Sequence, residues 1–263
     1  MTAWFLVDAF TERHFTGNPA AVVLLEAPPD QAWMRATAAE LHQPTTAFVW
    51  REGDAWGIRW FTPVRELPLC GHATLAAAHV LGQDEIVFRH GSRTLTASRG
   101  DGRIWLDFPA VPVASRQAPA EVLDAIGLTS VAGFATNDDD HVIVLDTAAQ
   151  VEALRPDIPR ILRLPARRVI VTAPGGADAD FTSRVFVPAV GLDEDHVTGS
   201  AHAVLGPLWA ARLGRDRLEA VQASARGGRL SLRVGGGRVH VGGHAVTTSQ
   251  GTLTLHGGPQ PTS

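Results

Sequence analysis

The sequence contains no lysine and no tyrosine, and it has a single cysteine, Cys70. Without lysine the chain cannot form a Schiff base, which excludes pyridoxal-phosphate and aldolase-type mechanisms. The absence of tyrosine removes phenolic acids and bases. One cysteine excludes an intramolecular disulfide framework and makes the cytoplasm the expected compartment.

Long apolar runs and blocks of one charge are also missing. No run approaches the ~18 residues that a membrane helix needs. The formal net charge is −4, without a basic patch. We therefore expect neither a membrane nor a nucleic acid as the main partner.

What recurs along the chain is the pattern of short strands. Segments rich in Val, Ile and Phe and bounded by Gly, Pro and Asp predict strands at 4–7, 20–25, 46–50, 57–61, 85–88, 103–106, 142–145, 168–172, 183–187, 230–234 and 238–241. Helical patterns are fewer: Gln31–Leu41, with Asp30 as its N-cap, and shorter ones at Ala120–Ile126 and Gln150–Leu154. This mixture predicts an α+β fold with largely antiparallel or mixed sheets.

An internal repeat is the most informative feature. In the first half, Phe61-Thr62-Pro63 is followed by Gly71-His72-Ala73-Thr74 and an apolar helix that Gly82 stops. In the second half, Phe186-Val187-Pro188 is followed by Thr198-Gly199-Ser200-Ala201 and an apolar helix that Gly214 stops. Both helices are apolar on nearly all sides, which predicts that both are buried.

The repeat predicts two pseudo-symmetric lobes, each a curved, mainly antiparallel or mixed β-sheet wrapped around a central buried helix. The Pro- and Ala-rich stretch 109–119 suggests the boundary, giving lobes of residues 1–112 and 113–263. The last ~15 residues are candidates to pack back on the first lobe.

Two glycine-initiated helices suggest an anion site. The first N–H groups of a helix lack intrahelical partners, the helix dipole adds positive charge there, and glycine lets a ligand approach the backbone. Two such ends facing one cleft would bind a small carboxylate and could stabilise a carbanion or enolate. The same spacing also fits two ordinary core helices, and the pattern alone does not separate these alternatives.

Several motifs together resemble the phenazine-biosynthesis PhzF-like family of the diaminopimelate epimerase-like fold. They occur in the expected order and read VDAFT from Val7, FTGNPAAV from Phe15, RWFTP from Arg59, LCGHATL from Leu69, SRVF from Ser183, TGSAH from Thr198 and QASARGG from Gln222. The resemblance implies an isomerase or epimerase that shifts a proton in a small carboxylic acid and needs no metal or organic cofactor. It also suggests secondary metabolism such as antibiotic biosynthesis and, by analogy only, a homodimer.

The sequence departs from the family at one important position. The family usually carries its proton on a Glu within a segment that corresponds here to residues 38–49, and Thr45 stands at the position of that Glu. A threonine hydroxyl is no general base near neutral pH without a neighbouring base. The proton carrier that the resemblance implies is therefore missing at this position.

The resemblance implies the remaining candidate site residues. The catalytic candidates are Asp195, His72, Thr45 and Ser200, with Cys70 and His42 as two further candidates. Cys70 is expected at a helix N-terminus, which would lower its pKa, although a free cysteine is usually just buried. His42 could supply a base near Thr45 or simply be a surface residue at a helix end. The substrate-binding candidates are Gly71, Gly199, Asn18, Ala73, Thr198 and Gln222.

Histidine spacing matches no metal motif, so no metal site is expected. Three hypotheses remain for the function. The first is a cofactor-independent isomerase acting on a small anionic substrate. The second is a protein that binds such a metabolite without converting it, and the third is lyase or hydrolase chemistry on the same scaffold.

Overall fold

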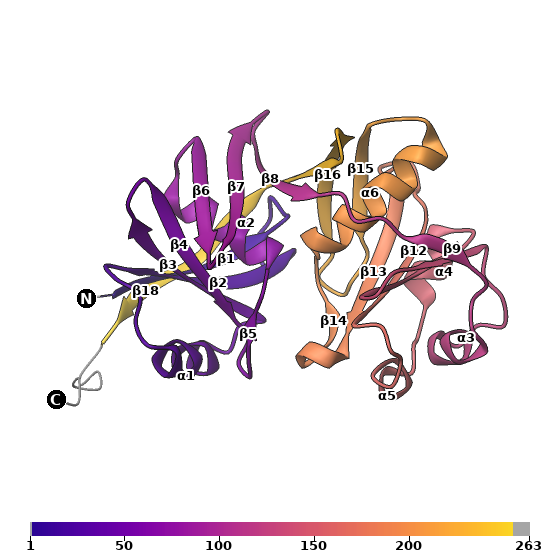
Figure 1. Cartoon of the computed structure of the whole chain (residues 1–263), viewed down its shortest axis with the longest axis horizontal. Coiled ribbons are helices and arrows are strands. Elements are labelled where there is room, and N and C mark those ends of the chain that lie inside the picture. Colours follow the sequence, from indigo (N-terminus) through magenta and orange to yellow (C-terminus); the bar gives the residue numbers. More distant parts are fainter. Residues whose placement is uncertain (1, 255–263) are drawn as a thin grey trace.

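The structure, a computed structural model, describes residues 2–254 (Figure 1). Its helices are α1 (Gln31–Leu41), α2 (Gly71–Leu81), α3 (Ala120–Ile126), α4 (Ala148–Ala153), α5 (Ile158–Ile161) and α6 (Gly199–Leu213), with a 3₁₀ turn at Pro188–Val190. No helix among these residues is long and apolar enough to cross a membrane.

The strands form one large sheet that curves through the whole molecule. They are β1 (Thr2–Ala9), β2 (Asn18–Leu25), β3 (Thr45–Glu52), β4 (Ala55–Phe61), β5 (Glu66–Leu67), β6 (Glu85–His90), β7 (Arg93–Gly100), β8 (Arg103–Pro109), β9 (Ala114–Arg116), β10 (Gly133–Thr136), β11 (Asp140–Val144), β12 (Arg168–Pro174), β13 (Phe181–Val187), β14 (Leu192–Asp195), β15 (Arg217–Gln222), β16 (Gly228–Gly235), β17 (Arg238–Gly243) and β18 (Ala245–Leu253). Most neighbours are antiparallel, but β2–β3, β4–β6, β11–β12 and β13–β15 are parallel pairs. The predicted mixed sheet with few helices is confirmed.

The predicted helix signals match the structure closely. Asp30 caps α1 by accepting a hydrogen bond from the backbone N–H of Trp33 at 2.9 Å. The repeat helices α2 and α6 begin at the two glycines and end at Gly82 and Gly214, both in left-handed conformation with φ of 68° and 65°. Left-handed glycine is a common helix C-cap because it lacks the Cβ that makes this conformation costly.

The predicted burial of the repeat helices is confirmed for all of α2 except its last turn and for the first two turns of α6. Strands β1, β2, β3, β8 and β18 pack around α2, whereas β8, β15, β16 and β17 pack around α6. Figure 1 shows α2 within the indigo and purple half and α6 within the orange half. The last residues of α6, 211–213, are exposed.

One proline interrupts the hydrogen-bond ladder of α6. Pro207 has no N–H to donate to the carbonyl of Ala203, one turn earlier. The backbone N–H of Val111 donates to this carbonyl instead, at 3.1 Å. The connection after β8 is thereby fixed to the middle of α6, where Ala203 also lines the cavity described below.

The two halves of the chain are joined at several points. Strand β17 pairs with β8, and the C-terminal strand β18 pairs with β1. Arg226 forms a 2.7 Å ion pair with the buried carboxylate of Asp8 and donates to the carbonyl of Gly17 at 2.9 Å. The division at residues 112 and 113 stays a prediction, and residues 255–263 of the second predicted lobe lie outside the described part of the chain.

Candidate active site

A cavity of about 440 Å³, called here the central cavity, lies where α2 and α6 begin. Its size is at the lower end of the range for small-molecule sites. Residues from both halves of the chain line it. The predicted site residues among them are Thr45, Cys70, Gly71, His72, Asp195, Thr198, Gly199 and Ser200.

The N-termini of α2 and α6 touch each other. A Cβ placed on Gly71 would lie 3.3 Å from the Cα of Gly199 and 3.5 Å from the backbone nitrogen of Ser200. A side chain at position 71 would therefore press on the start of α6. Each N-terminus carries roughly half a positive charge and unpaired N–H groups, so their junction favours a bound anion.

The side chain of Asn18 connects the two halves beside this junction. Its Nδ2 donates to Oδ1 of Asp195 at 2.6 Å and to the carbonyl of Val197 at 2.9 Å, and lies 3.0 Å from Nδ1 of His72. The amide nitrogen has two N–H groups for these three neighbours and cannot accept, so Nδ1 of His72 at most shares one of them and is the unprotonated nitrogen; a neutral His72 then carries its proton on Nε2. The structure therefore places Asn18 behind the two candidate proton carriers and outside the lining of the cavity.

His72 is held in its neutral form. Burial lowers the pKa of its imidazole, the nearby charge of Asp195 opposes this effect, and His196 adds to it. Desolvation disfavours the charged form of a buried histidine. The imidazole can therefore donate a hydrogen bond from Nε2 without carrying a charge.

Asp195 is a half-buried carboxylate at the end of β14. Besides the bond from Asn18, its Oδ2 accepts a hydrogen bond from the hydroxyl of Thr198 at 2.6 Å. Gln222 supports this arrangement, since its Oε1 accepts from the backbone N–H of Thr198 at 2.8 Å and its Nε2 donates to the carbonyl of Asp195 at 2.6 Å. Gln222 is fully buried and supports the site from behind the cavity wall.

Of the two alternatives for Cys70, a buried thiol and a thiol activated by the helix start, the structure favours the buried thiol. Burial raises the pKa of its thiol to about 12, which outweighs the opposing effects of the Thr45 hydroxyl and of the backbone N–H of Ala73. The thiol donates a weak hydrogen bond to Oγ1 of Thr45 at 3.6 Å. Desolvation thus wins over the helix N-terminus, and Cys70 stays protonated at neutral pH.

Two further predicted residues, Ala73 and His42, also lie away from the cavity surface. Ala73 is fully buried in the first turn of α2. His42 is the C-cap of α1, in left-handed conformation with φ of 50°, and is not among the residues that line the cavity. The structure does not bring His42 to the site as a base for Thr45.

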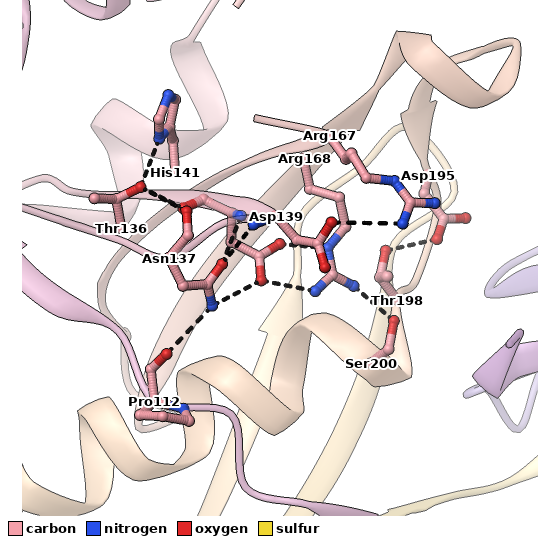
Figure 2. Close-up of polar contacts among 11 residues, drawn as sticks. Pro112, Thr136, Asn137, Asp139, His141, Arg167, Arg168, Asp195, Thr198 and Ser200 are labelled. Carbon is pink, nitrogen blue, oxygen red and sulfur yellow. Dashed lines mark hydrogen bonds and ion pairs between the residues drawn. The ribbon is translucent and has the colours of Figure 1, made fainter. Parts of the chain in front are cut away.

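Ser200, a predicted site residue, contacts a group of charged residues that were not predicted (Figure 2). Nη1 of Arg168 donates to Oγ of Ser200 at 2.7 Å, while Nε and Nη2 of Arg168 hold the carboxylate of Asp140 at 2.5 and 2.9 Å. The lining residues Arg93, Asp139, Arg167 and Arg168 were not expected at the site. The only signal in the sequence was the pair Arg167 and Arg168 at the start of the predicted strand 168–172. Adjacent arginines are common at positions that bind no ligand.

No group of three His, Cys, Asp or Glu side chains within residues 2–254 could hold a metal ion. The cavity instead offers a carboxylate, a neutral imidazole, hydroxyl groups and backbone N–H groups. This set of groups can bind an anion and move a proton.

Comparison with solved structures identifies the class of fold. A probable proline racemase from Agrobacterium radiobacter superposes with a TM-score of 0.64 at 11% identity, over 97% of this chain and 94% of that chain. At this identity only the fold is shared. A protein of the phenazine biosynthesis PhzF family from Enterococcus faecalis superposes far better, with a TM-score of 0.92 and 38% identity over 97% of this chain and 99% of that chain.

Residues 7–251 match the family described as phenazine biosynthesis-like protein, and this chain belongs to that family. A protein of Pseudomonas aeruginosa named an uncharacterised isomerase is 47% identical, over 95% of this chain and 97% of its own length. The human phenazine biosynthesis-like domain-containing protein is 38% identical, over 95% of this chain and 98% of its own length. The resemblance noted in the sequence is thus confirmed, and with it an epimerase-like fold.

Proposed function

We propose that this protein is an isomerase that shifts a proton within a small carboxylic acid and needs neither a metal nor an organic cofactor. The observation that carries the proposal is the hydrogen-bonded group of Asp195, Asn18 and His72 beside the joined starts of α2 and α6. Family membership supports an isomerase- or epimerase-type reaction.

In this proposal the substrate carboxylate binds the backbone N–H groups near Gly71 and Gly199. Asp195 then removes a proton from a carbon next to an unsaturated or carboxylate group, and the negative charge spreads onto the substrate oxygen. The Nε2–H of His72 donates a hydrogen bond to this developing charge. The carboxyl proton of Asp195 exchanges with solvent, and Asp195 then protonates another carbon, so the reaction conserves charge and, in H₂O, mass.

Thr45 takes a different role from the Glu that the family resemblance implies at its position. Its hydroxyl accepts the thiol hydrogen of Cys70 and lines the cavity. In this proposal Thr45 shapes the site, and the proton is carried on the opposite wall by Asp195. The two halves of the chain, residues 1–112 and 113–263, would then act as pseudo-symmetric walls of one cavity.

Solvent deuterium uptake tests the proposal. The wild-type protein is incubated in D₂O with a panel of small unsaturated and amino carboxylic acids, and deuterium at carbon is followed by NMR. We expect the wild type to take up deuterium into at least one acid. Asp195→Asn should lower the rate of uptake at least ~100-fold, because a missing general base typically costs this much. His72→Ala should lower the rate by a smaller factor. Asp193→Asn, on the exposed part of the same strand, is the matched control. Unchanged exchange in both site variants overturns the assignment.

The absence of a Glu at position 45 favours one alternative, a protein that binds its metabolite without converting it. Thr45→Glu separates the two. If the wild type exchanges no tested acid and Thr45→Glu gains exchange on a family substrate, the binding function is supported. Mass analysis of products separates lyase or hydrolase chemistry, since only an isomerase conserves mass. Cytoplasmic location, homodimer formation and a place in antibiotic biosynthesis stay predictions.

A further inference from the structure

Two adjacent arginines, Arg167 and Arg168, line the central cavity outside the group that we assign to proton transfer. They stand at the start of β12, beside the beginning of α6. Figure 2 shows both side chains directed toward the side where Ser200 and Asp195 lie. Neither is needed to bind a single carboxylate at the helix junction.

Arg168 is held rigidly. Its guanidinium binds both oxygens of Asp140, whose side chain is 1% exposed, and its remaining terminal nitrogen binds Ser200. Asp140 and Arg168 are register partners at the first position of the parallel pair β11–β12. A bidentate carboxylate in this position fixes the plane of the guanidinium.

The turn that carries the partner carboxylates is itself well supported. Oδ1 of Asn137 accepts the backbone N–H groups of Asp139 and Asp140 at 2.9 and 2.7 Å. The backbone carbonyl of Asp139 accepts the N–H groups of Arg167 and Arg168 at 2.9 and 3.0 Å. The carboxylates of the consecutive residues 138–140, all aspartates, repel one another. The turn offsets this repulsion because it brings the guanidinium groups of Arg167 and Arg168 beside them at the cavity wall.

Free hydrogen-bond donors remain on both arginines. A guanidinium has five N–H groups, and Arg168 uses one on each of its three nitrogens within the described residues. Arg167 has a single long contact, 3.5 Å from its Nη1 to Oδ1 of Asp139, and both side chains of that pair are at least half exposed. Donors of this kind prefer carboxylate oxygens, which accept them in pairs.

We propose that Arg167 and Arg168 bind a second carboxylate of the substrate, so that the substrate class is a short dicarboxylic acid. This inference rests on the proposed function for the first carboxylate, at Gly71 and Gly199. Ser200 directly follows Gly199 and contacts Arg168, so the two acid-binding positions adjoin. Adjoining positions select a short carbon chain between the two carboxylates.

A purely structural role explains less of the geometry. The Arg168–Asp140 pair alone could simply fasten β11 to β12. That role does not require the hydrogen bond from Arg168 to Ser200, which lines the cavity. It also does not require Arg167, which lines the same wall and is held by one long contact. Arg167 therefore distinguishes the two explanations, and its removal leaves the buried Asp140 with its partner.

Calorimetric titration tests the proposal without turnover. The wild type is titrated with succinate, glutarate and adipate, each compared with the monocarboxylate of the same carbon number, in phosphate-free buffer of low ionic strength. We expect one dicarboxylate to bind at least ~10-fold more tightly than its monocarboxylate partner, since a charge-assisted bidentate bond is worth this much. Arg167→Gln should remove the preference by weakening dicarboxylate binding far more than monocarboxylate binding.

Arg116→Gln, an exposed arginine on β9 outside the cavity lining, is the matched control and should keep the preference. Equal binding of every dicarboxylate and monocarboxylate pair by the wild type, or a preference that survives Arg167→Gln, overturns the proposal. Tighter binding of inorganic phosphate than of any dicarboxylate also overturns it. Deuterium exchange separates the two proposals. If the dicarboxylate preference holds but no acid exchanges, only the isomerase assignment is rejected. If a dicarboxylate exchanges equally fast in the wild type and in Arg167→Gln, only the second carboxylate site is rejected.

Discussion

Gly71 and Gly199 lie in backbone contact, so that the first turns of α2 and α6 form one continuous positive surface. The two glycines are far apart in the chain, and each starts a helix that is buried along most of its length. A buried helix start needs a partner for its N–H groups. The contact supplies a reason for glycine at position 71 that helix capping alone does not give.

A methyl group at this contact should weaken anion binding. In Gly71→Ala the new Cβ would stand 3.3 Å from the Cα of Gly199, tighter than an ordinary contact, and would force the helix starts apart. We expect carboxylate affinity to fall about 10-fold, which corresponds to ~1.4 kcal/mol. Titration with a carboxylate ligand measures this change. Gly235→Ala, which has open space around the added Cβ, is the control, and equal affinity in both variants contradicts the prediction.

Removing the Asn18 side chain should destabilise the protein. In Asn18→Ala, Oδ1 of Asp195 and the carbonyl of Val197 lose their donor in a largely buried place. An unpaired buried polar group costs about 1–3 kcal/mol, more when it is charged. Urea denaturation followed by fluorescence measures the free energy of unfolding. Gln43→Ala, whose bond to the carbonyl of Leu41 lies near the surface, should change it little. A difference below ~0.5 kcal/mol between the two variants would count against this role.

Cys70 should resist alkylation in the folded protein. Burial raises the pKa of its thiol to about 12, so almost none is thiolate at neutral pH, and the thiolate is the reactive form. Iodoacetamide labelling followed by mass spectrometry gives an unambiguous result, because the chain has one cysteine. Labelling at pH 7.5 should be slow without denaturant and fast in 6 M urea. Fast labelling of the folded protein would show that the thiol is accessible and ionised.

His202 should make the fold sensitive to acid. Burial lowers the pKa of its imidazole from 6.5 to about 4, with a partly opposing effect of the bond to the carbonyl of Thr198. Between pH 6.5 and 4 the unfolded chain therefore binds a proton that the folded chain does not. Stability rises with pH through this window and falls on acidification, by about 3 kcal/mol for the full shift.

His202→Gln removes this titration and keeps a side chain that can donate to the carbonyl of Thr198. We expect the variant to lose less stability than the wild type between pH 6.5 and 4, even if it is less stable at pH 7. Urea denaturation at several pH values measures the slope. His240→Gln, at an exposed position on β17, is the control. Parallel pH profiles for the wild type and His202→Gln would refute the assignment.

The sequence predicted those features that depend on local chemistry. Asp30 can cap α1 whatever the rest of the chain does, and Gly82 and Gly214 end their helices because a left-handed residue is needed there. The motifs around Gly71 and Gly199 are likewise readable as helix starts. Their repetition predicted two buried helices and drew attention to the residues that line the central cavity.

Features that depend on contacts across the chain could not be predicted. The sequence left open whether the helix start would lower the pKa of Cys70 or whether the thiol would simply be buried, and the depth of burial decides this by raising the pKa. His42 is close to Thr45 in sequence, yet the left-handed end of α1 leaves it away from the cavity. Arg168 reaches the cavity only because β11 and β12 pair in parallel and set it against Asp140.

The sequence by itself determined the helix starts at two glycines, the capped helix α1 and many of the strands, although β7, β10, β15 and β18 were not predicted. The family resemblance in the sequence pointed to the carboxylate of Asp195 and the imidazole of His72. The tertiary structure alone decided how these groups act on one another. Desolvation and long-range hydrogen bonds depend on what surrounds a side chain, and the chain order does not specify those surroundings. The neutral His72, the protonated Cys70 and the pair Arg167 and Arg168 on the cavity wall are products of that packing.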